Sequence, residues 1–480
     1  MEGCLTIHAL WRGRTNAERT PADPTSAIEA SREGKTREGT SADRPESVDA
    51  LIGWALIFVG LLLLFVSEKH RVIGDGMTRF ISLRLLFERG ELSDMPYSMI
   101  GPIFATPFYL LDRVVDTPLW WASRYNFFVF VAGLVLLWRL LRPHLDDDVL
   151  RRFLLLLVVG SMFPRHQMEF YGEVFTAVLA GAGLLALCWR NSVWGWLALL
   201  LAVANTPASV VGLAVASVAL TLRHRRSRLL ALPLAAVMLV FVESWIRRGD
   251  PMLSGYEGSA GHTTILPYSG QPGFTYPFFF GLISILFSFG KGLLFFAPGL
   301  FLNVKEGMML RSAALWQAYR LWLLFLAGMV LVYAKWWSWY GGWFWGPRFF
   351  LFASLPASLA LAVALGMRRE RIVPNLLLLL VLGLSITVGV TGVVFDQYGL
   401  EACTRNGYAL EALCWYVPEY SALFHPFVDA KPLTSEDRLF ISFGGISLLW
   451  LALPVLRDLR RGIRAGAHEM GSWSWGDLRF

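Results

Sequence analysis

Apolar residues recur in twelve runs along the chain, separated by short polar or basic segments. A helix needs about 20 predominantly apolar residues to cross the hydrocarbon core of a bilayer. The pattern therefore predicts an all-α integral membrane protein with about 12 transmembrane helices. The runs lie at roughly 51–67, 118–142, 150–165, 169–189, 194–205, 207–222, 229–246, 277–303, 313–333, 350–366, 373–395 and 438–456. The two runs around Asn205-Thr206-Pro207 are short, and one long kinked helix is the alternative for them.

Basic residues gather in four clusters between these runs. Such clusters favour the cytoplasmic side of a membrane. Only a division of 194–222 into two spans puts all four on one side, with both termini also cytoplasmic. The larger loops, 68–117, 247–276, 334–349 and 396–437, then lie outside with the short segment 166–168. The clusters are Arg139/Arg142/Arg151/Arg152, Arg223/Arg225/Arg226/Arg228, Arg368/Arg369/Arg371 and Arg457/Arg460/Arg461/Arg464.

Composition agrees with a membrane protein, since 55% of the 480 residues are hydrophobic and only 16% are charged. The net charge of +7 is concentrated in the loop clusters, which argues against a nucleic-acid partner. Residues 1–49 are rich in Ser, Thr, Arg, Glu and Pro, and this composition predicts a disordered cytoplasmic tail. A transmembrane domain over 50–456 and a cytoplasmic tail over 457–480 complete the expected organisation.

Several kinds of chemistry lack their sequence signals. No GxxxxGK[ST], GxSxG or HExxH motif occurs, which argues against an ATPase, a serine hydrolase and a zinc protease. No Cys/His cluster has metal-ligand spacing, so we expect no metal site and no bound cofactor, although a divalent ion is not excluded. Cys403 and Cys414 share a predicted outer loop, where a disulfide and two free thiols are both open.

The first outer loop contains the segment from Gly74 to Leu111. Apolar and arginine positions alternate along it, which predicts an amphipathic helix on the membrane surface; they are Phe80, Leu83, Leu85 and Leu86 with Arg79, Arg84 and Arg89. Asp75 precedes this helix, and spacing alone favours a carboxylate that caps the helix N-terminus. A general base at the water–lipid boundary is the functional alternative.

A second polar segment, Tyr333 to Phe350, carries five tryptophans between glycine turns and ends at Arg348. The tryptophans could form an ordinary interfacial belt, and Arg348 could snorkel from a helix end. Their density instead suggests a shaped loop, and an arginine there can bind a phosphate with its planar fork.

Two ionisable residues stand inside apolar runs. Lys291 is flanked by Gly290 and Gly292, which predicts a helix break and a lysine facing a polar cavity or an anionic ligand. Glu169 and Glu173 are one helical turn apart and share a face. Glu173 lies deeper in its run and is the better candidate for a cavity residue.

The segments GDG around Asp75, SFGKGLLFFAPG around Lys291 and WWSWYGGWFWGPR ending at Arg348 resemble the GT-C superfamily of membrane glycosyltransferases. More closely, the chain resembles bacterial proteins similar to the family 39 dolichyl-phosphate-mannose mannosyltransferases. This resemblance implies Asp75 as catalytic base and a polyprenyl-phosphate-linked sugar as donor. Many members have a second acid directly after the aspartate, whereas Gly76 stands here, so that Glu173 and Asp94 are left as candidates for the second acid or the acceptor site.

The resemblance also implies basic ligands of the donor phosphate, for which Lys291 and Arg348 are the best matches, and Arg79 is a further candidate. Trp336, Trp339, Tyr340 and Trp343 would then contact sugar or lipid. The expected activity is inverting sugar transfer to a hydroxyl of a glycan, lipid or protein acceptor, at the outer face of a bacterial inner membrane. A transporter or flippase for a lipid-linked or anionic solute, with Lys291 and Glu173 lining the passage, is the alternative. A non-catalytic scaffold that retains the fold is a third.

Overall fold

The computed structural model describes residues 43–190, 192–225, 227–367 and 371–471. Within these ranges it consists of α-helices and short 3-10 segments, with two isolated β-bridges and no β-strand. Residues 1–51 and 52–480 form separate units, and the description below concerns the second. Arg226, Arg368 and Arg369 of the predicted basic clusters lie outside the described residues, as does the predicted tail up to residue 42.

Seven helices are long and apolar enough to cross a membrane, and four shorter apolar helices accompany them in the described part of the chain. The described residues confirm the expectation of an all-α chain with several helices that could span a membrane, whereas the number twelve stays a prediction. The long helices are α2 (Asp43–Val66), α10 (Glu173–Arg190), α13 (Ala231–Arg248), α17 (Ala313–Tyr333), α18 (Ser354–Leu365, continuing the 3-10 segment η4, Arg348–Ala353), α19 (Ile372–Val394) and α22 (Ser435–Gly471). The shorter ones are α7 (Tyr125–Leu141), α11 (Val193–Asn205), α12 (Val210–His224, after η1, Pro207–Ser209) and α14 (Phe278–Phe287).

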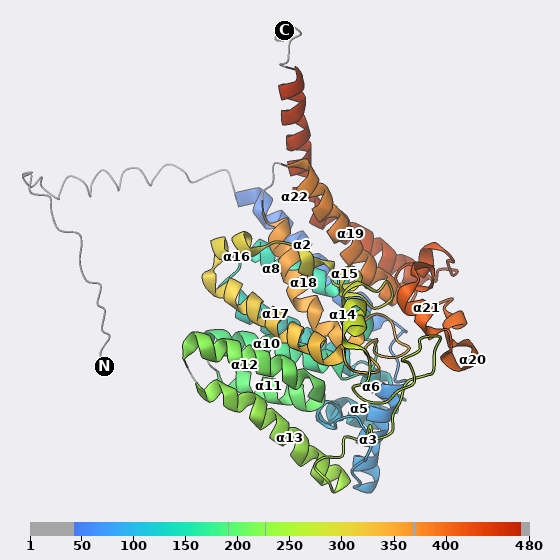
Figure 1. Ribbon diagram of the computed structural model, residues 1–480. Coiled ribbons are helices and arrows are strands. Elements are labelled where there is room, and N and C mark those ends of the chain that lie inside the picture. The colour runs from blue at the N-terminus through green and yellow to red at the C-terminus, as the bar shows by residue number, and fades with distance from the viewer. Residues whose placement is uncertain (1–42, 191, 226, 368–370, 472–480) are drawn as a thin grey trace, which may run out of the picture. The chain divides into compact units, whose positions relative to one another are not determined.

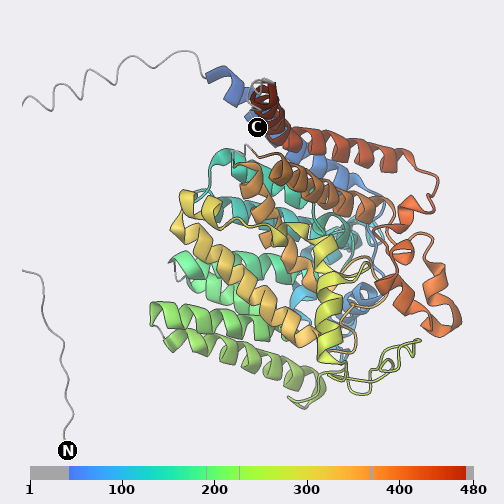
Figure 2. The same cartoon turned by 45° about the horizontal axis from the view of Figure 1, so that its top comes forward.

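The connecting segments carry further short helices. Those before α10 are α3 (Asp75–Arg89), α4 (Ile100–Phe104), α5 (Thr106–Val115), α6 (Trp120–Ser123), α8 (Asp147–Val159) and α9 (Phe163–His166). Those after it are η2 (Ser227–Leu230), α15 (Leu293–Phe296), η3 (Pro298–Phe301), α16 (Lys305–Arg311), η5 (Glu401–Thr404), α20 (Arg405–Tyr408), α21 (Glu411–Tyr416), η6 (Pro418–Tyr420) and η7 (His425–Phe427). In Figures 1 and 2, α11, α12 and α13 lie on one flank of the helix set and α19 and α22 on the other.

The run 277–303 is not one continuous span, because the chain leaves the helix after Phe287 and re-enters it only at Leu293. The amide of Gly290 donates to the carbonyl of Trp415 at 3.0 Å. A Cβ on Gly290 would lie 1.9 Å from the carbonyl oxygen of Cys414. The predicted break at the Gly-Lys-Gly segment is therefore confirmed, and the break brings a distant loop against the helix.

The segment 194–222 forms two helices that run in opposite directions. At the end of α11, the side chain of Asn205 accepts a hydrogen bond from Arg79, beside the start of α10. At the end of α12, Arg223 instead lines a cavity with Cys188, near the other end of α10. The chain thus reverses at Thr206–Ser209, and the alternative of one long helix is wrong.

The described members of the basic clusters lie at one end of the helix set, which we call the basic end. There Arg152 donates to the carbonyl of Leu365 at 2.9 Å, and Arg311 donates to Asp146 and to the carbonyl of Gly366. The loops predicted to lie outside meet at the opposite end, which we call the loop end. This common sidedness agrees with the positive-inside pattern. Which end faces the cytoplasm stays a prediction.

Helical structure extends into both predicted tails. α2 begins at Asp43, inside the tail predicted for 1–49, and α22 continues to Gly471, well beyond the predicted end of the last span at 456. Residues 457–471 are therefore helical, and their place on the cytoplasmic side stays a prediction.

Candidate functional site

Three of the residues singled out from the sequence meet at the loop end. Arg348, at the start of η4, places one guanidinium nitrogen 2.5 Å from a carboxylate oxygen of Asp75, at the start of α3. Another guanidinium nitrogen lies 3.7 Å from Glu173, at the start of α10. The Nε–H of Arg348 donates to the carbonyl of Gly341 at 2.6 Å. Three helix starts thus converge on one arginine that is only 7% exposed.

Asp75 does not cap α3, so the interpretation that spacing alone favoured is wrong. The N-cap position belongs to Gly74, and no side chain caps the helix. Burial by itself would raise the pKa of Asp75, but the Arg348 guanidinium and a hydrogen bond from Tyr97 hold the pKa of this carboxyl below its ordinary value. The carboxylate is therefore ionised at neutral pH and faces a cation rather than the helix amides.

Aromatic rings enclose the guanidinium of Arg348. Its central carbon lies 4.0 Å from the ring centre of Phe344, 5.1 Å from that of Phe349 and 5.3 Å from that of Tyr171. Cation–π attraction at such distances is worth roughly 0.5 to 2 kcal/mol, depending on desolvation. The rings hold the arginine beside the two carboxylates and limit its contact with water.

Lys291 shapes the aromatic loop. Its ammonium donates to the carbonyls of Gly342 at 3.2 Å, Phe344 at 2.5 Å and Gly346 at 3.0 Å. A lysine ammonium has three N–H donors, so three loop carbonyls occupy all of them. Both glycines have a left-handed backbone, at φ 75° and 65°, which lets the loop turn its carbonyls inward. Lys291 therefore stabilises this conformation of the loop that ends at Arg348.

The other two predicted residues of the first loop lie apart from each other. Arg79 is buried and donates to the carbonyl of Ser98 at 3.3 Å and to the side chain of Asn205 at 3.4 Å. The expectation of a surface helix with its arginines on the polar face is thus wrong for this residue. Asp94 is exposed, and its backbone carbonyl accepts a hydrogen bond from Arg248. The structure records no contact of the Asp94 carboxylate with Asp75.

A cavity of about 600 Å³ opens beside Arg348, and its lining is rich in charge. The sequence reasoning did not single out most of these residues. Arg71 has a side chain that is 42% exposed, and it pairs with Asp396 at 2.5 Å and with Glu169 at 3.1 Å. Arg165 pairs with Asp396 at 2.9 Å. The basic lining residues are Lys69, Arg71, Arg165, Arg348 and Lys431, and the acidic ones are Glu68, Glu169 and Asp396.

The four aromatic residues expected to contact sugar or lipid divide into two groups. Trp343 lines the cavity beside Arg348. Trp339 and Tyr340 are instead buried and pack on Trp415, with ring centres 5.6 Å and 3.9 Å away. Trp336 packs against aromatic rings of the loop before α14. Only Trp343 of the four lines the cavity, and the others support the loop.

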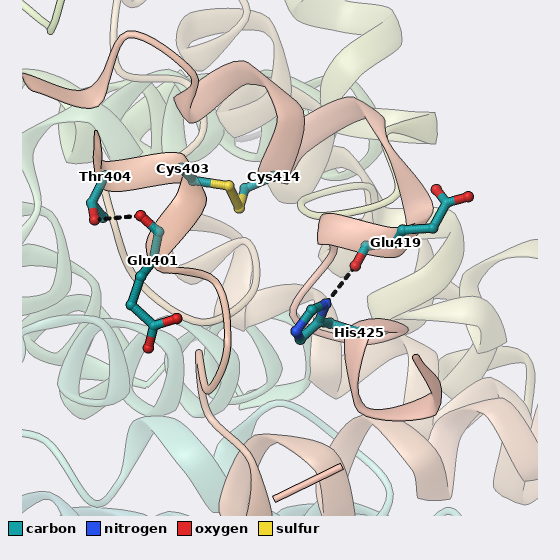
Figure 3. Close-up of a disulfide and its surroundings, with 6 residues drawn as sticks. All are labelled: Glu401, Cys403, Thr404, Cys414, Glu419 and His425. Atoms are coloured by element: carbon teal, nitrogen blue, oxygen red, sulfur yellow. Dashed lines mark hydrogen bonds between the residues drawn. A yellow bond between two sulfur atoms is a disulfide. The ribbon is translucent and has the colours of Figure 1, made fainter. Parts of the chain in front are cut away.

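A disulfide joins Cys403 and Cys414, whose Cα atoms are 6.2 Å apart, which settles the choice that the sequence left open (Figure 3). It closes the loop that carries Glu411, a residue 1% exposed. Burial raises the pKa of Glu411 to about 7, while Lys291 and a hydrogen bond from Tyr340 oppose this. Disulfides persist in oxidising compartments, so the bridge fits a loop outside the cytoplasm. No group of three or more potential ligands is arranged for a metal ion within the described residues.

Comparison with known proteins shows the fold but no sequence family. No protein-family profile and no curated protein sequence matches this chain. Among solved structures, ArnT from Cupriavidus metallidurans in its apo state is similar with a TM-score of 0.50 and 14% sequence identity. The match covers 88% of this chain and 80% of that chain. The chain therefore has an ArnT-like fold, and the likeness to GT-C and family 39 enzymes stays a prediction.

Proposed function

We propose that this protein is an inverting glycosyltransferase, which moves a sugar from a polyprenyl-phosphate donor to an acceptor hydroxyl at the outer membrane face. The observation that carries the proposal is the Asp75–Arg348 pair, which stands beside a cavity lined by five basic residues. An anionic lipid phosphate fits this charge, and a carboxylate at the same point can accept a proton. The ArnT-like fold supports the proposal.

In this mechanism the donor phosphate enters the basic cavity and competes with Asp75 for Arg348. The acceptor oxygen attacks the anomeric carbon while the bond from this carbon to the phosphate oxygen breaks, and the electron pair leaves with the phosphate. The acceptor proton passes to Asp75. Arg348 and its basic neighbours stabilise the charge on the departing phosphate. Because the displacement is single, the anomeric configuration inverts.

Glu173 and Lys291 receive supporting roles. Glu173 and Asp75 both pair with Arg348. We assign Glu173 to keep its ion pair with the guanidinium when the phosphate displaces Asp75. Lys291 positions the aromatic loop through its three carbonyl contacts. Three basic residues that line the cavity are better placed to bind the phosphate than Lys291 or Arg79. They are Lys69, Arg71 and Lys431. We place the protein in a bacterial inner membrane with its loop end outside.

The test is donor turnover by the purified protein in detergent with radiolabelled polyprenyl-phosphate sugars and a panel of acceptor hydroxyls. We expect wild type to release polyprenyl phosphate and Asp75→Asn to lose at least about 100-fold in rate, as for other catalytic bases. Asp94→Asn, which removes an exposed carboxylate of the same loop, is the matched control and should keep full activity. If Asp75→Asn retains sugar transfer, the assignment of Asp75 as the catalytic base is refuted. If the labelled lipid crosses the liposome membrane without being consumed, a flippase is favoured.

A further inference from the structure

A second cavity, of about 180 Å³, lies at the basic end among α10, α12 and α17, far from Asp75 along the helices. Its polar lining comes from Arg223, Arg320 and Gln317. Both arginines are exposed, and no ion pair joins either one to a carboxylate of the described chain. Its apolar lining consists of Cys188, Ala219, Leu220, Leu321 and Leu324.

The packing of α12 against α17 explains why this cavity exists. The two helices approach most closely at Gly212 and Gly328, where a Cβ on Gly328 would lie 2.6 Å from the Cα of Gly212. Small residues allow helix backbones to approach closely in a membrane. Arg223 and Arg320 lie two to three turns from that contact, and the cavity lies at that level. The space between the helices opens toward the basic end.

Two guanidinium groups at one cavity repel each other, and an anion between them removes this repulsion. On α17, Gln317, Arg320, Leu321 and Leu324 follow the spacing i, i+3, i+4 and i+7, which puts them on one face. This face is polar at the basic end and apolar toward the middle of the helix. A free phosphate would use only the arginines, whereas a phospholipid would also cover the half-buried Leu324.

We propose that this cavity binds an anionic glycerophospholipid, with the phosphodiester between Arg223 and Arg320 and an acyl chain that leaves the cavity past Leu324. Basic pockets between transmembrane helices on the cytoplasmic side bind such headgroups in other proteins. The lipid is a structural ligand of the α12–α17 pair. The site is independent of the proposed transferase activity.

Cys188 lines the same cavity and provides the readout. In a Cys4→Ser background it is the free thiol, since Cys403 and Cys414 are bridged. The protein is placed in nanodiscs of phosphatidylcholine, with or without phosphatidylglycerol, and the rate of Cys188 alkylation by N-ethylmaleimide is measured. We expect phosphatidylglycerol to slow alkylation about tenfold, because occupied sites do not react.

The double variant Arg223→Gln/Arg320→Gln should lose this protection, because two basic residues near a membrane surface account for about 30-fold in affinity. The ratio of rates with and without phosphatidylglycerol is compared within each variant, which removes any direct effect of Arg223 on the thiol. Arg457→Gln/Arg460→Gln removes equal charge from α22 and should retain protection. Equal alkylation of wild type in both lipids would overturn the proposal. If inorganic phosphate slows the alkylation of Cys188 in nanodiscs of phosphatidylcholine alone, the ligand is a soluble anion and the proposal of a lipid is overturned.

Discussion

Replacement of Arg348 by glutamine tests whether the arginine couples the two carboxylates of the site. The substitution removes the cation that lies 2.5 Å from Asp75 and 3.7 Å from Glu173. It also removes the donor to the Gly341 carbonyl. Two carboxylates are then left near each other without a counter-charge, in a site where the arginine itself was 7% exposed.

Loss of one partner from a buried ion pair costs about 3 to 5 kcal/mol. The side chain of Asp75 is 21% exposed, so water relieves part of this cost, and we expect Arg348→Gln to lower the free energy of unfolding by about 3 kcal/mol. Asp75→Asn should cost about 1 to 2 kcal/mol. The double variant leaves only Glu173 without its counter-charge, instead of two neighbouring carboxylates, so its cost should fall short of the sum by about 2 kcal/mol.

The measurement is unfolding by dodecyl sulfate in mixed dodecyl maltoside micelles, followed by tryptophan fluorescence, for wild type, both single variants and the double variant. Arg84→Gln is the control, because Arg84 pairs with Glu88 at 3.6 Å on the exposed side of α3. Exposed pairs contribute at most about 1 kcal/mol, so this variant should differ little from wild type. Strictly additive costs for Asp75→Asn and Arg348→Gln would refute the coupling.

Three further predictions concern the loop that carries the disulfide. Burial raises the pKa of Glu411 to about 7, so the folded protein keeps the Glu411 carboxyl protonated at pH values where the unfolded chain ionises it. The free energy of unfolding should therefore fall as pH rises from about 4.5 to 7. Glu411→Gln should abolish this dependence in unfolding titrations. Cys403→Ser/Cys414→Ser opens a ring of separation 11, which is worth about 3 kcal/mol, so limited proteolysis of the loop should accelerate about 100-fold. Gly290→Ala puts a Cβ 1.9 Å from the Cys414 carbonyl oxygen and should cost about 3 kcal/mol or more. Gly445→Ala meets nothing within 4 Å, and an equal cost there would contradict the steric reasoning.

The membrane fold could be predicted because lipid allows few backbone solutions. Each spanning segment must satisfy its own hydrogen bonds, so long apolar runs reveal helices. Clustered arginines between the runs reveal which helix ends lie together, and the reversal at Thr206–Ser209 followed from this rule. The glycines beside Lys291 predicted a break in the run 277–303, but the point where the helix ends, after Phe287, could not be predicted because the contact with Trp415 comes from more than a hundred residues away.

The site could be predicted residue by residue but not as an assembly. Asp75, Glu173 and Arg348 each stood out locally, as a carboxylate before a helix, an acid in an apolar run and an arginine after glycine turns. Their meeting depends on three helix starts that the sequence separates by about a hundred residues or more. Arg71 and Asp396 were missed because each gains its partner from another segment, and no local pattern marks such a pair.

The decisive difference among the basic residues lies in what occupies their donors. The donors of Lys291 are all taken by carbonyls, and Arg79 donates to a carbonyl and to an amide oxygen. These are neutral partners whose loss would open the loop or the first helix. Arg348 instead holds carboxylates. A phosphate can replace a carboxylate on an arginine without loss of charge pairing. Under the proposed function, the anion that binds Arg348 thereby frees Asp75 to act as a base, which makes donor binding a condition for proton acceptance.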